Sequence, residues 1–358
     1  MDTCLTPAGS NVTPGVREMA CRLNNDAASF AKATANLERT AQIKMSDEQL
    51  RQLVEGEGRL VLAAQRNDTI SPAFTSRDCT VPEDSKKTRM YAGIDGVMVP
   101  LVTDVEKQKR REKVVQKRRA AENAGKHRPP LLPRRHGADQ SFKEFKTITF
   151  YDELNDHRHI VLSRAKRTKT GPILRREAER LKFQDADERI ANVDGASWIP
   201  IQLEDAELRL HGMGLDFYHL SENVHKARRR VYGEENEAGK AWATDCLHKF
   251  KHEKYETIHE ELLEWRAGLR GGKRTAATKL LNYIVERRNM INYPEFIERG
   301  WQIGSGPTEA RCKTSTSRLK RSGQKWDAPN AEQIAALGNL QDSDQWDSYW
   351  RTLVAKRI

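Results

Sequence analysis

The order of strand-like and helix-like segments between residues 89 and 220 limits the fold more than any other feature of this sequence. Five segments have the short apolar or alternating runs typical of β-strands, and one has apolar residues at helical spacing. In chain order they are MYAGIDGVMVPLV, FKTITFYDE, HRHIVLSRA, the helical GPILRREAERLKF, RIANVDGASWIPI and MGLDFYHL. Strand, strand, strand, helix, strand, strand is the order of a mixed α/β sheet whose first three strands form a meander. We therefore predict an α/β fold.

Two of these segments place an Asp-Gly pair inside an apolar run, with Asp95 on the first strand and Asp194 on the fourth. A buried carboxylate is costly to desolvate, so these acids need an explanation. Asp-Gly is also the commonest hairpin-turn signal, which leaves a plain turn as the alternative. If the two strands pair side by side, the carboxylates can lie about 5 Å apart, the spacing of neighbouring strands.

A third acid, Glu309, lies in the stretch WQIGSGPTEARCKTSTSRLKRSG. Pro307 fits the first position of a helix, which places Glu309 in its first turn. A glutamate at this position also occurs for the helix dipole alone. Three convergent carboxylates would suit a pair of Mg²⁺ ions about 3.5 to 4 Å apart, with Mn²⁺ as a substitute. Such a pair activates a water or a DNA 3′-hydroxyl.

The charge balance indicates a polyanionic partner, for which nucleic acid is the usual choice. The chain has 62 Lys and Arg against 51 Asp and Glu. Between Lys107 and Arg135, inside a basic insertion at 107–136, twelve Lys or Arg face two Glu. This segment is either a solvated helix followed by a Pro-rich loop, or an arm that contacts phosphates. Its candidate DNA contacts are Lys117, Arg118 and Arg119.

The helix predicted after Glu309 carries six positive charges and no acid within fifteen residues. A solvated face would more often mix the two signs, so we favour contact with the DNA backbone. The candidate residues are Arg311, Lys313, Arg318, Lys320, Arg321 and Lys325.

The cysteines and the hydropathy pattern favour a soluble cytoplasmic protein. The five cysteines are odd in number, widely spaced and form no Cys-x-x-Cys pair, which fits a reducing compartment. No stretch approaches the roughly 18 apolar residues that a spanning helix needs. The first residues also lack the basic and then apolar layout of a signal peptide. We therefore expect no membrane partner.

Composition and periodicity divide the chain into five regions. An N-terminal helical region at 1–66 contains three short helices, which permit a DNA-binding helix-turn-helix or a plain bundle. A linker follows at 67–88 and the first part of the sheet core at 89–220. Residues 221–300 read as an all-α insertion. Residues 301–358 then complete the core with the Glu309 helix and a C-terminal helix.

Four stretches and the closing segment resemble the ISKra-type transposases, a DDE group of bacterial insertion sequences. They are GIDGVMVP, NVDGASWI, LDFYHLSENV, GWQIGSGPTEARCKTSTSRLKRSGQKW and the closing SDQWDSYW. The resemblance covers roughly residues 14 to 352. The stretch in which Gly-Ser-Gly leads into Glu309 is its most specific part.

The resemblance implies a ribonuclease H-like catalytic core in which Asp95, Asp194 and Glu309 form a Mg²⁺-binding triad. Asp216 and His219 match an Asp-x-x-His pair near the active site. Asp216 could orient His219, and His219 could contact the scissile DNA or be a core histidine at a strand end. The implied partners are double-stranded DNA, as terminal inverted repeats and target, and further copies of the chain, as a homodimer or larger assembly at the nucleoid.

The implied activity is Mg²⁺-dependent cleavage and strand transfer at the element's ends. The alternative is a shortened or domesticated transposase-derived protein that binds DNA without mobilising it. Relatives are expected to carry more sequence upstream, which keeps that alternative open. A structure-selective nuclease on the same core is a third interpretation, and the long helical insertion counts against it.

Overall fold

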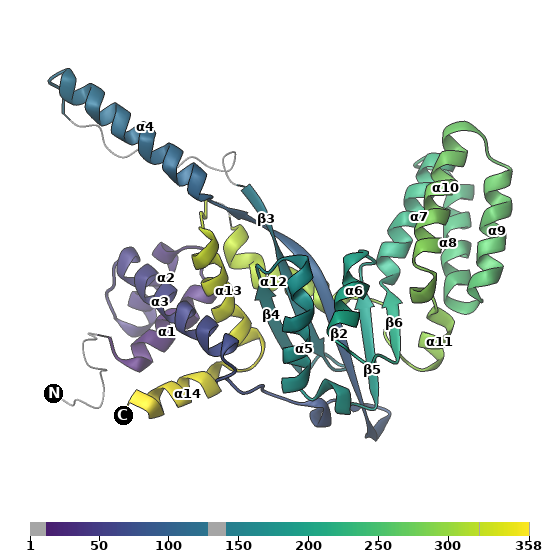
Figure 1. The fold of residues 1–358 in the computed structure, drawn as a ribbon, viewed down its shortest axis with the longest axis horizontal. Coiled ribbons are helices and arrows are strands. Elements are labelled where there is room, and N and C mark those ends of the chain that lie inside the picture. Colours follow the sequence, from purple (N-terminus) through teal and green to yellow (C-terminus); the bar gives the residue numbers. More distant parts are fainter. Residues whose placement is uncertain (1–11, 128–140, 322, 358) are drawn as a thin grey trace.

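The sheet predicted from the sequence forms the centre of the molecule (Figure 1). The computed structural model describes residues 12–127, 141–321 and 323–357. The strands are β1 (Thr80–Val81), β2 (Asp84–Leu101), β3 (Ser141–Tyr151), β4 (Arg158–Ser163), β5 (Glu188–Val193) and β6 (Gly212–Leu215). Their order is β4-β3-β2-β5-β6, with β1 paired to β2. β2, β3 and β4 form an antiparallel meander, and β5 and β6 run parallel to β2. The predicted mixed α/β architecture is confirmed.

Alternation along the strands gives the sheet two different faces. One face carries Ala92, Ile94, Ile148 and Phe150, which are buried in a large apolar core. This core includes apolar residues of α5 (Thr170–Arg180) and α6 (Trp198–Asp205). The opposite face carries the alternate residues of β2 and β3, among them Gly93 and Asp95 with their β3 partners Thr149 and Thr147. We call these four residues the polar face.

α12 (Gly306–Lys320) lies across the polar face, and beside it the same side of the sheet contributes Val97, Val99 and Phe145 to a second core. That core joins three N-terminal helices, α1 (Pro14–Asp26), α2 (Phe30–Ala41) and α3 (Asp47–Arg66), to two C-terminal helices, α13 (Ala328–Asp342) and α14 (Trp346–Arg357). Trp346 Nε1 of α14 donates to Glu18 Oε1 of α1 at 3.0 Å. The three helices predicted in the N-terminal region are confirmed, and Thr13, Ser29 and Ser46 N-cap them.

The predicted all-α insertion forms a helical lobe at the β6 edge of the sheet (Figure 1). It comprises α7 (Phe217–Tyr232), α8 (Glu237–His252), α9 (Tyr255–Ala267), α10 (Gly271–Glu286) and α11 (Tyr293–Glu298). The lobe shares an apolar core with the sheet and bonds to it, as in the hydrogen bond from Tyr293 Oη to the carbonyl oxygen of Leu215 at 3.0 Å. α7 starts directly after β6, and at the end of α10 Arg287 Nε donates to the carbonyl oxygen of Gly195 at 3.0 Å.

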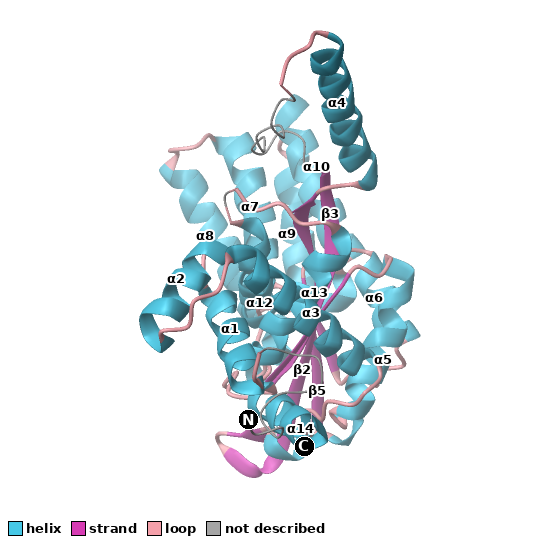
Figure 2. Ribbon diagram, turned by 90° about the vertical axis from the view of Figure 1, so that its left-hand side faces the viewer, coloured by secondary structure: helices cyan, strands magenta, loops and turns pink. Residues whose placement is uncertain are grey.

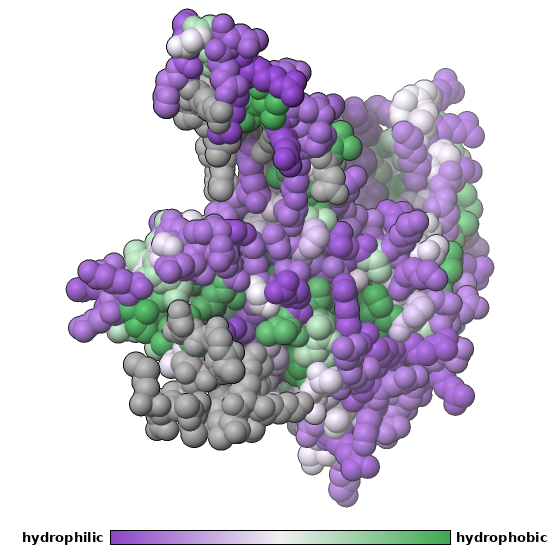
Figure 3. Space-filling model, turned by 60° about the vertical axis from the view of Figure 1, so that its left-hand side comes forward, coloured by the Kyte–Doolittle hydropathy of each residue, from purple (hydrophilic) through white to green (hydrophobic). Residues whose placement is uncertain are grey.

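α4 (Asp104–Asn123) is the helical part of the basic insertion, and it projects away from the body in Figures 1 and 2. Its surface is predominantly hydrophilic (Figure 3). Residues 128–140, which include the predicted Pro-rich loop, lie outside the described residues. Within the described ranges, no helix has the length and apolar character needed to cross a membrane.

Three predicted boundaries are wrong. Residues 84–88, assigned to the linker, belong to β2. The fourth strand stops at Val193 because Asp194 Oδ1 accepts from the Ala196 N–H and Gly195 turns the chain with φ +81°. The segment WIPI therefore begins α6. The fifth strand stops at Leu215 because Asp216 N-caps α7.

Candidate active site

The register of the sheet places Asp95 and Asp194 at the same level on neighbouring strands. The last paired residues of β2 and β5 are Ala92 and Ala191. Asp95 lies three residues beyond Ala92 on β2, and Asp194 lies three residues beyond Ala191, directly after the end of β5, so the two acids come to the same side of the sheet. Asp95 is inside β2 and is not part of a turn, whereas Asp194 leads into the Gly195 turn. The hairpin alternative is therefore wrong for the first Asp-Gly pair.

Asp95 is a partly buried carboxyl group with few hydrogen bonds. Oδ1 accepts from the Gly96 N–H at 2.6 Å, and Oδ2 accepts from Cys312 Sγ of α12 at 3.2 Å. Burial raises the pKa of Asp95, the Cys312 contact lowers it, and the charge of Asp194 raises it further. The two aspartates are therefore close enough to repel each other when both are ionised.

A close backbone approach positions α12 over these acids. Gly93 has no Cβ, and one built there would lie 1.9 Å from Thr308 Oγ1. Thr308 also shares a 2.8 Å hydrogen bond with Thr149 of β3. One turn further along the helix, Cys312 reaches Asp95. Gly93, Thr308 and Cys312 were not predicted as site residues. The sequence feature that points to Thr308 and Cys312 is their spacing of four residues, which places both on one face of the helix.

Glu309 follows Thr308 in the first turn of α12, as predicted, and faces His219. His219 Nε2 lies 3.4 Å from Glu309 Oε1, and the two side chains are 33% and 38% exposed. His219 occupies the first turn of α7, so the alternative of a core histidine at a strand end is wrong. This contact therefore joins α7 of the helical lobe, which carries His219, to α12, which carries Glu309.

The four predicted catalytic residues thus lie in two pairs, Asp95 with Asp194 and Glu309 with His219. In the described part of the chain, no three His, Cys, Asp or Glu side chains are grouped closely enough to hold one metal ion. Repulsion between carboxylates opposes their closer approach in a metal-free chain.

Arg318, predicted to contact DNA, is instead buried beneath the N-terminal helices and is 5% exposed. Its guanidinium group donates to Asn24 Oδ1 at 3.2 Å and lies over the rings of Phe30 and Trp326. Burial lowers the pKa of Arg318 to about 10. The prediction of one continuous basic face on this helix is therefore corrected at Arg318, which stabilises the contact of α12 with α1 and α2.

The other basic residues after Glu309 have different surroundings. Lys313 is exposed, Arg311 is half-buried, and Arg321 donates to the carbonyl oxygen of Asp26 at 3.2 Å. Lys320 is exposed. Burial lowers the pKa of Lys320, whereas Cys312 and Asp95 act to raise it. On α4, the three candidate residues Lys117, Arg118 and Arg119 are all exposed.

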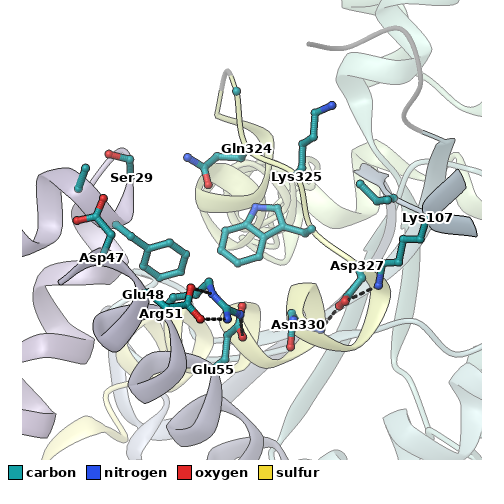
Figure 4. A pocket seen from close by; sticks show the side chains of 15 residues that line it. Ser29, Asp47, Glu48, Arg51, Glu55, Lys107, Gln324, Lys325, Asp327 and Asn330 are labelled. Atoms are coloured by element: carbon teal, nitrogen blue, oxygen red, sulfur yellow. Dashed lines mark hydrogen bonds and ion pairs between the residues drawn. The ribbon is translucent and has the colours of Figure 1, made fainter. Parts of the chain in front are cut away.

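A pocket of about 600 Å³ lies between the N-terminal helices, the start of α4 and the segment before α13 (Figure 4). Lys325 lines it, but none of the four predicted catalytic residues does. Its other charged groups include two ion pairs, Arg51 with Glu48 and Lys107 with Asp327, the latter at 2.7 Å. The Lys107–Asp327 pair joins α4 to the segment before α13, whereas Arg51 and Glu48 lie one turn apart on α3.

Replacing Asp95 with asparagine is expected to stabilise the metal-free protein at pH 7.5. Because the folded-state pKa of Asp95 is raised, ionisation costs stability as pH rises above the ordinary aspartate value of about 3.9. The gain, about 1 kcal/mol or 2 to 3 °C, should shrink as pH falls through that raised pKa. The melting temperatures of wild type and Asp95→Asn, measured in EDTA at pH 7.5 and at pH 5, give the gain at each pH.

The matched control is Asp185→Asn, at an exposed aspartate, for which no stabilisation is expected. Excess Mg²⁺ should raise the melting temperature of wild type more than that of Asp95→Asn, because binding to the folded state stabilises it. Equal responses of the two proteins to Mg²⁺ would contradict a metal-binding role for Asp95.

Comparison of the chain with known protein families and with curated proteins finds no match.

Proposed function

We propose that this protein is a DDE transposase that cleaves and joins DNA with Mg²⁺. The observation that carries the proposal is that Asp95 and Asp194 lie at the same height on neighbouring strands, beneath the helix that bears Glu309. The strand order supports a ribonuclease H-like core, because the strand carrying Asp95 is central, between an antiparallel pair and a parallel pair. The motifs of the ISKra-type group coincide with these three positions.

The three carboxylates fit the hard cation that the proposal requires. Mg²⁺ takes oxygen ligands, and Asp95, Asp194 and Glu309 supply only these. A divalent cation would also offset the burial and the repulsion that raise the pKa of Asp95. When bound, Mg²⁺ would lower the pKa of a water or a 3′-hydroxyl and stabilise the leaving oxygen of a phosphodiester.

The chain's own residues position the acids and the DNA. β2 and the end of β5 hold Asp95 and Asp194 on a rigid sheet, whereas Glu309 is placed by α12. His219 can donate from Nε2 to Glu309 and so orient the carboxylate, and its remaining exposed surface faces the DNA. Lys320, whose charge interacts with that of Asp95, would neutralise phosphate charge near the acids. Assembly of two or more copies on paired DNA ends at the nucleoid is part of the proposal.

The projecting helix α4 is proposed as a phosphate-contacting arm. Replacing Lys117, Arg118 and Arg119 together with alanine should weaken binding to double-stranded DNA of any sequence. The slope of log affinity against log salt should decrease by about 2.7, or about 0.9 for each lost phosphate contact. Fluorescence anisotropy between 50 and 300 mM salt measures this slope.

The control for this triple variant is the alanine replacement of three exposed basic residues of the helical lobe, Lys254, Lys273 and Arg274. The control should leave the slope within about 0.5 of wild type. If the two triple variants change the slope equally, α4 does not contact phosphates more than other basic surfaces do. Its basic residues would then only keep the helix solvated.

The function itself is tested with donor DNA carrying the sequences that flank the gene, together with a supercoiled target plasmid. The expected result is covalent joining of donor ends to the target in Mg²⁺ and none in EDTA. Binding without cleavage would support the transposase-derived DNA-binding protein instead. Cleavage without joining, on branched substrates, would support the nuclease.

A further inference from the structure

Asp216 lies in line with the two catalytic aspartates. β5 and β6 end their pairing at Val193 and Leu215, so the next residues, Asp194 and Asp216, are at the same level. Asp95 on β2 and the two residues that directly follow β5 and β6, Asp194 and Asp216, therefore lie in one row. By position alone, Asp216 would be a candidate for a further metal ligand.

The hydrogen bonds of Asp216 argue against that role. Oδ1 accepts from the backbone N–H of Tyr218 at 2.6 Å and of His219 at 3.1 Å. Oδ2 accepts from the backbone N–H of Ser305 and from Ser305 Oγ, the latter at 2.6 Å. A carboxylate has about four lone-pair sites, so these four donors occupy all of them. The side chain is also fully buried.

The four donors come from two segments that are distant in sequence. Two belong to the first turn of α7, which carries His219. The other two belong to Ser305, the residue before α12, which carries Glu309. A backbone bond from the Phe217 N–H to the carbonyl oxygen of Ile303, 2.9 Å long, joins the same two segments. Asp216 thus connects the starts of the two helices whose side chains meet at the 3.4 Å His219–Glu309 contact.

We propose that Asp216 is a positioning residue that holds His219 and Glu309 together and does not bind the metal. The inference deepens the proposed function and rests on it for the role of Glu309. The bonds around Asp216 are properties of the fold and can be tested independently. Charge-assisted hydrogen bonds to buried backbone groups are strong, so loss of the carboxylate should release both segments at once.

The test variant is Asp216→Asn, which keeps the size of the side chain but turns one acceptor into a donor that faces Ser305 or the α7 turn. Hydrogen exchange of the Tyr218, His219 and Ser305 amides should accelerate together, by about tenfold or more. Ser305→Ala, a milder change, should accelerate exchange at His219 in the same direction. Exchange in α9, remote from the site, should stay unchanged in both.

A second experiment measures Mg²⁺ binding by calorimetric titration. Its matched control is Asp194→Asn. The control should raise the half-saturating Mg²⁺ concentration about tenfold or more and leave exchange at Ser305 unchanged. Asp216→Asn should raise that concentration less than Asp194→Asn does, because it displaces a proposed ligand, Glu309, without removing one, while lowering the maximal rate of DNA cleavage.

Two results would overturn the inference: unchanged exchange at both segments in Asp216→Asn, or a rise in half-saturating Mg²⁺ equal to that of Asp194→Asn. Absence of Mg²⁺ binding by wild type would instead refute the proposed function. In that case the exchange measurements alone still decide whether Asp216 joins the two helices.

Discussion

Replacing Glu309 with glutamine is expected to lower the rate of DNA strand cleavage about a thousandfold. Glutamine has the same size and can still contact His219 across the 3.4 Å separation, so the packing of α12 should be retained. It lacks the negative charge that holds a divalent cation. Loss of several kcal/mol of metal-derived stabilisation corresponds to a factor of this size, since about 1.4 kcal/mol is tenfold. DNA affinity should stay within about twofold of wild type, because the phosphate contacts are unchanged.

End-labelled donor DNA and a sequencing gel measure cleavage, and anisotropy measures binding on the same preparations. The matched control is Glu264→Gln, an exposed glutamate of α9 in the helical lobe, which should cleave at the wild-type rate. Wild-type cleavage by Glu309→Gln would remove Glu309 from the chemistry. A parallel loss of DNA binding would show that the substitution disturbs the fold.

The second large effect is expected at Gly93, where alanine should lower the free energy of unfolding by about 3 kcal/mol. The added Cβ would lie 1.9 Å from Thr308 Oγ1 and 2.7 Å from Thr149 Oγ1. Neither atom can move far, because the two hydroxyl groups are buried and hydrogen-bonded to each other. α12 would have to lift away from the sheet. Urea denaturation followed by circular dichroism gives the loss.

Gly96→Ala is the control on the same strand. A Cβ at Gly96 would meet Glu144 Oε1 at 2.3 Å, but this atom is the end of a flexible, partly exposed side chain. A loss below about 1 kcal/mol is therefore expected. Similar losses for the two variants would mean that α12 does not rest on Gly93 as closely as the structure indicates.

The fold was largely predictable because period-two alternation and turn residues are local signals. They predicted the order of elements along the chain, the meander of the first three strands and the three N-terminal helices. The strand ends were missed where a polar side chain ends a strand. Asp194 and Asp216 both lie within apolar segments, yet each bonds to backbone N–H groups two or three residues ahead and turns the chain.

The candidate site was predictable as a set of residues but not as an arrangement. Only the register of β2 with β5 places Asp95 level with Asp194, and register depends on long-range pairing. Arg318 shows that counting charges in the sequence does not reveal which basic side chains are buried. Charge counting treats all six basic residues after Glu309 alike, whereas helix geometry directs Arg318 into the N-terminal helices and Lys320 towards Asp95.

The shared core of the N-terminal and C-terminal helices has a consequence for biosynthesis. Glu18 and Trp346, which bond across that core, are 328 positions apart. At about 5 to 20 residues per second, a ribosome needs about 15 to 65 s to connect them. During that interval α1, α2 and α3 lack their apolar partners, and Asp95 and Asp194 precede the helix that carries Glu309. On the proposed function, the nascent chain would therefore lack its complete set of acids until α12 has been synthesised.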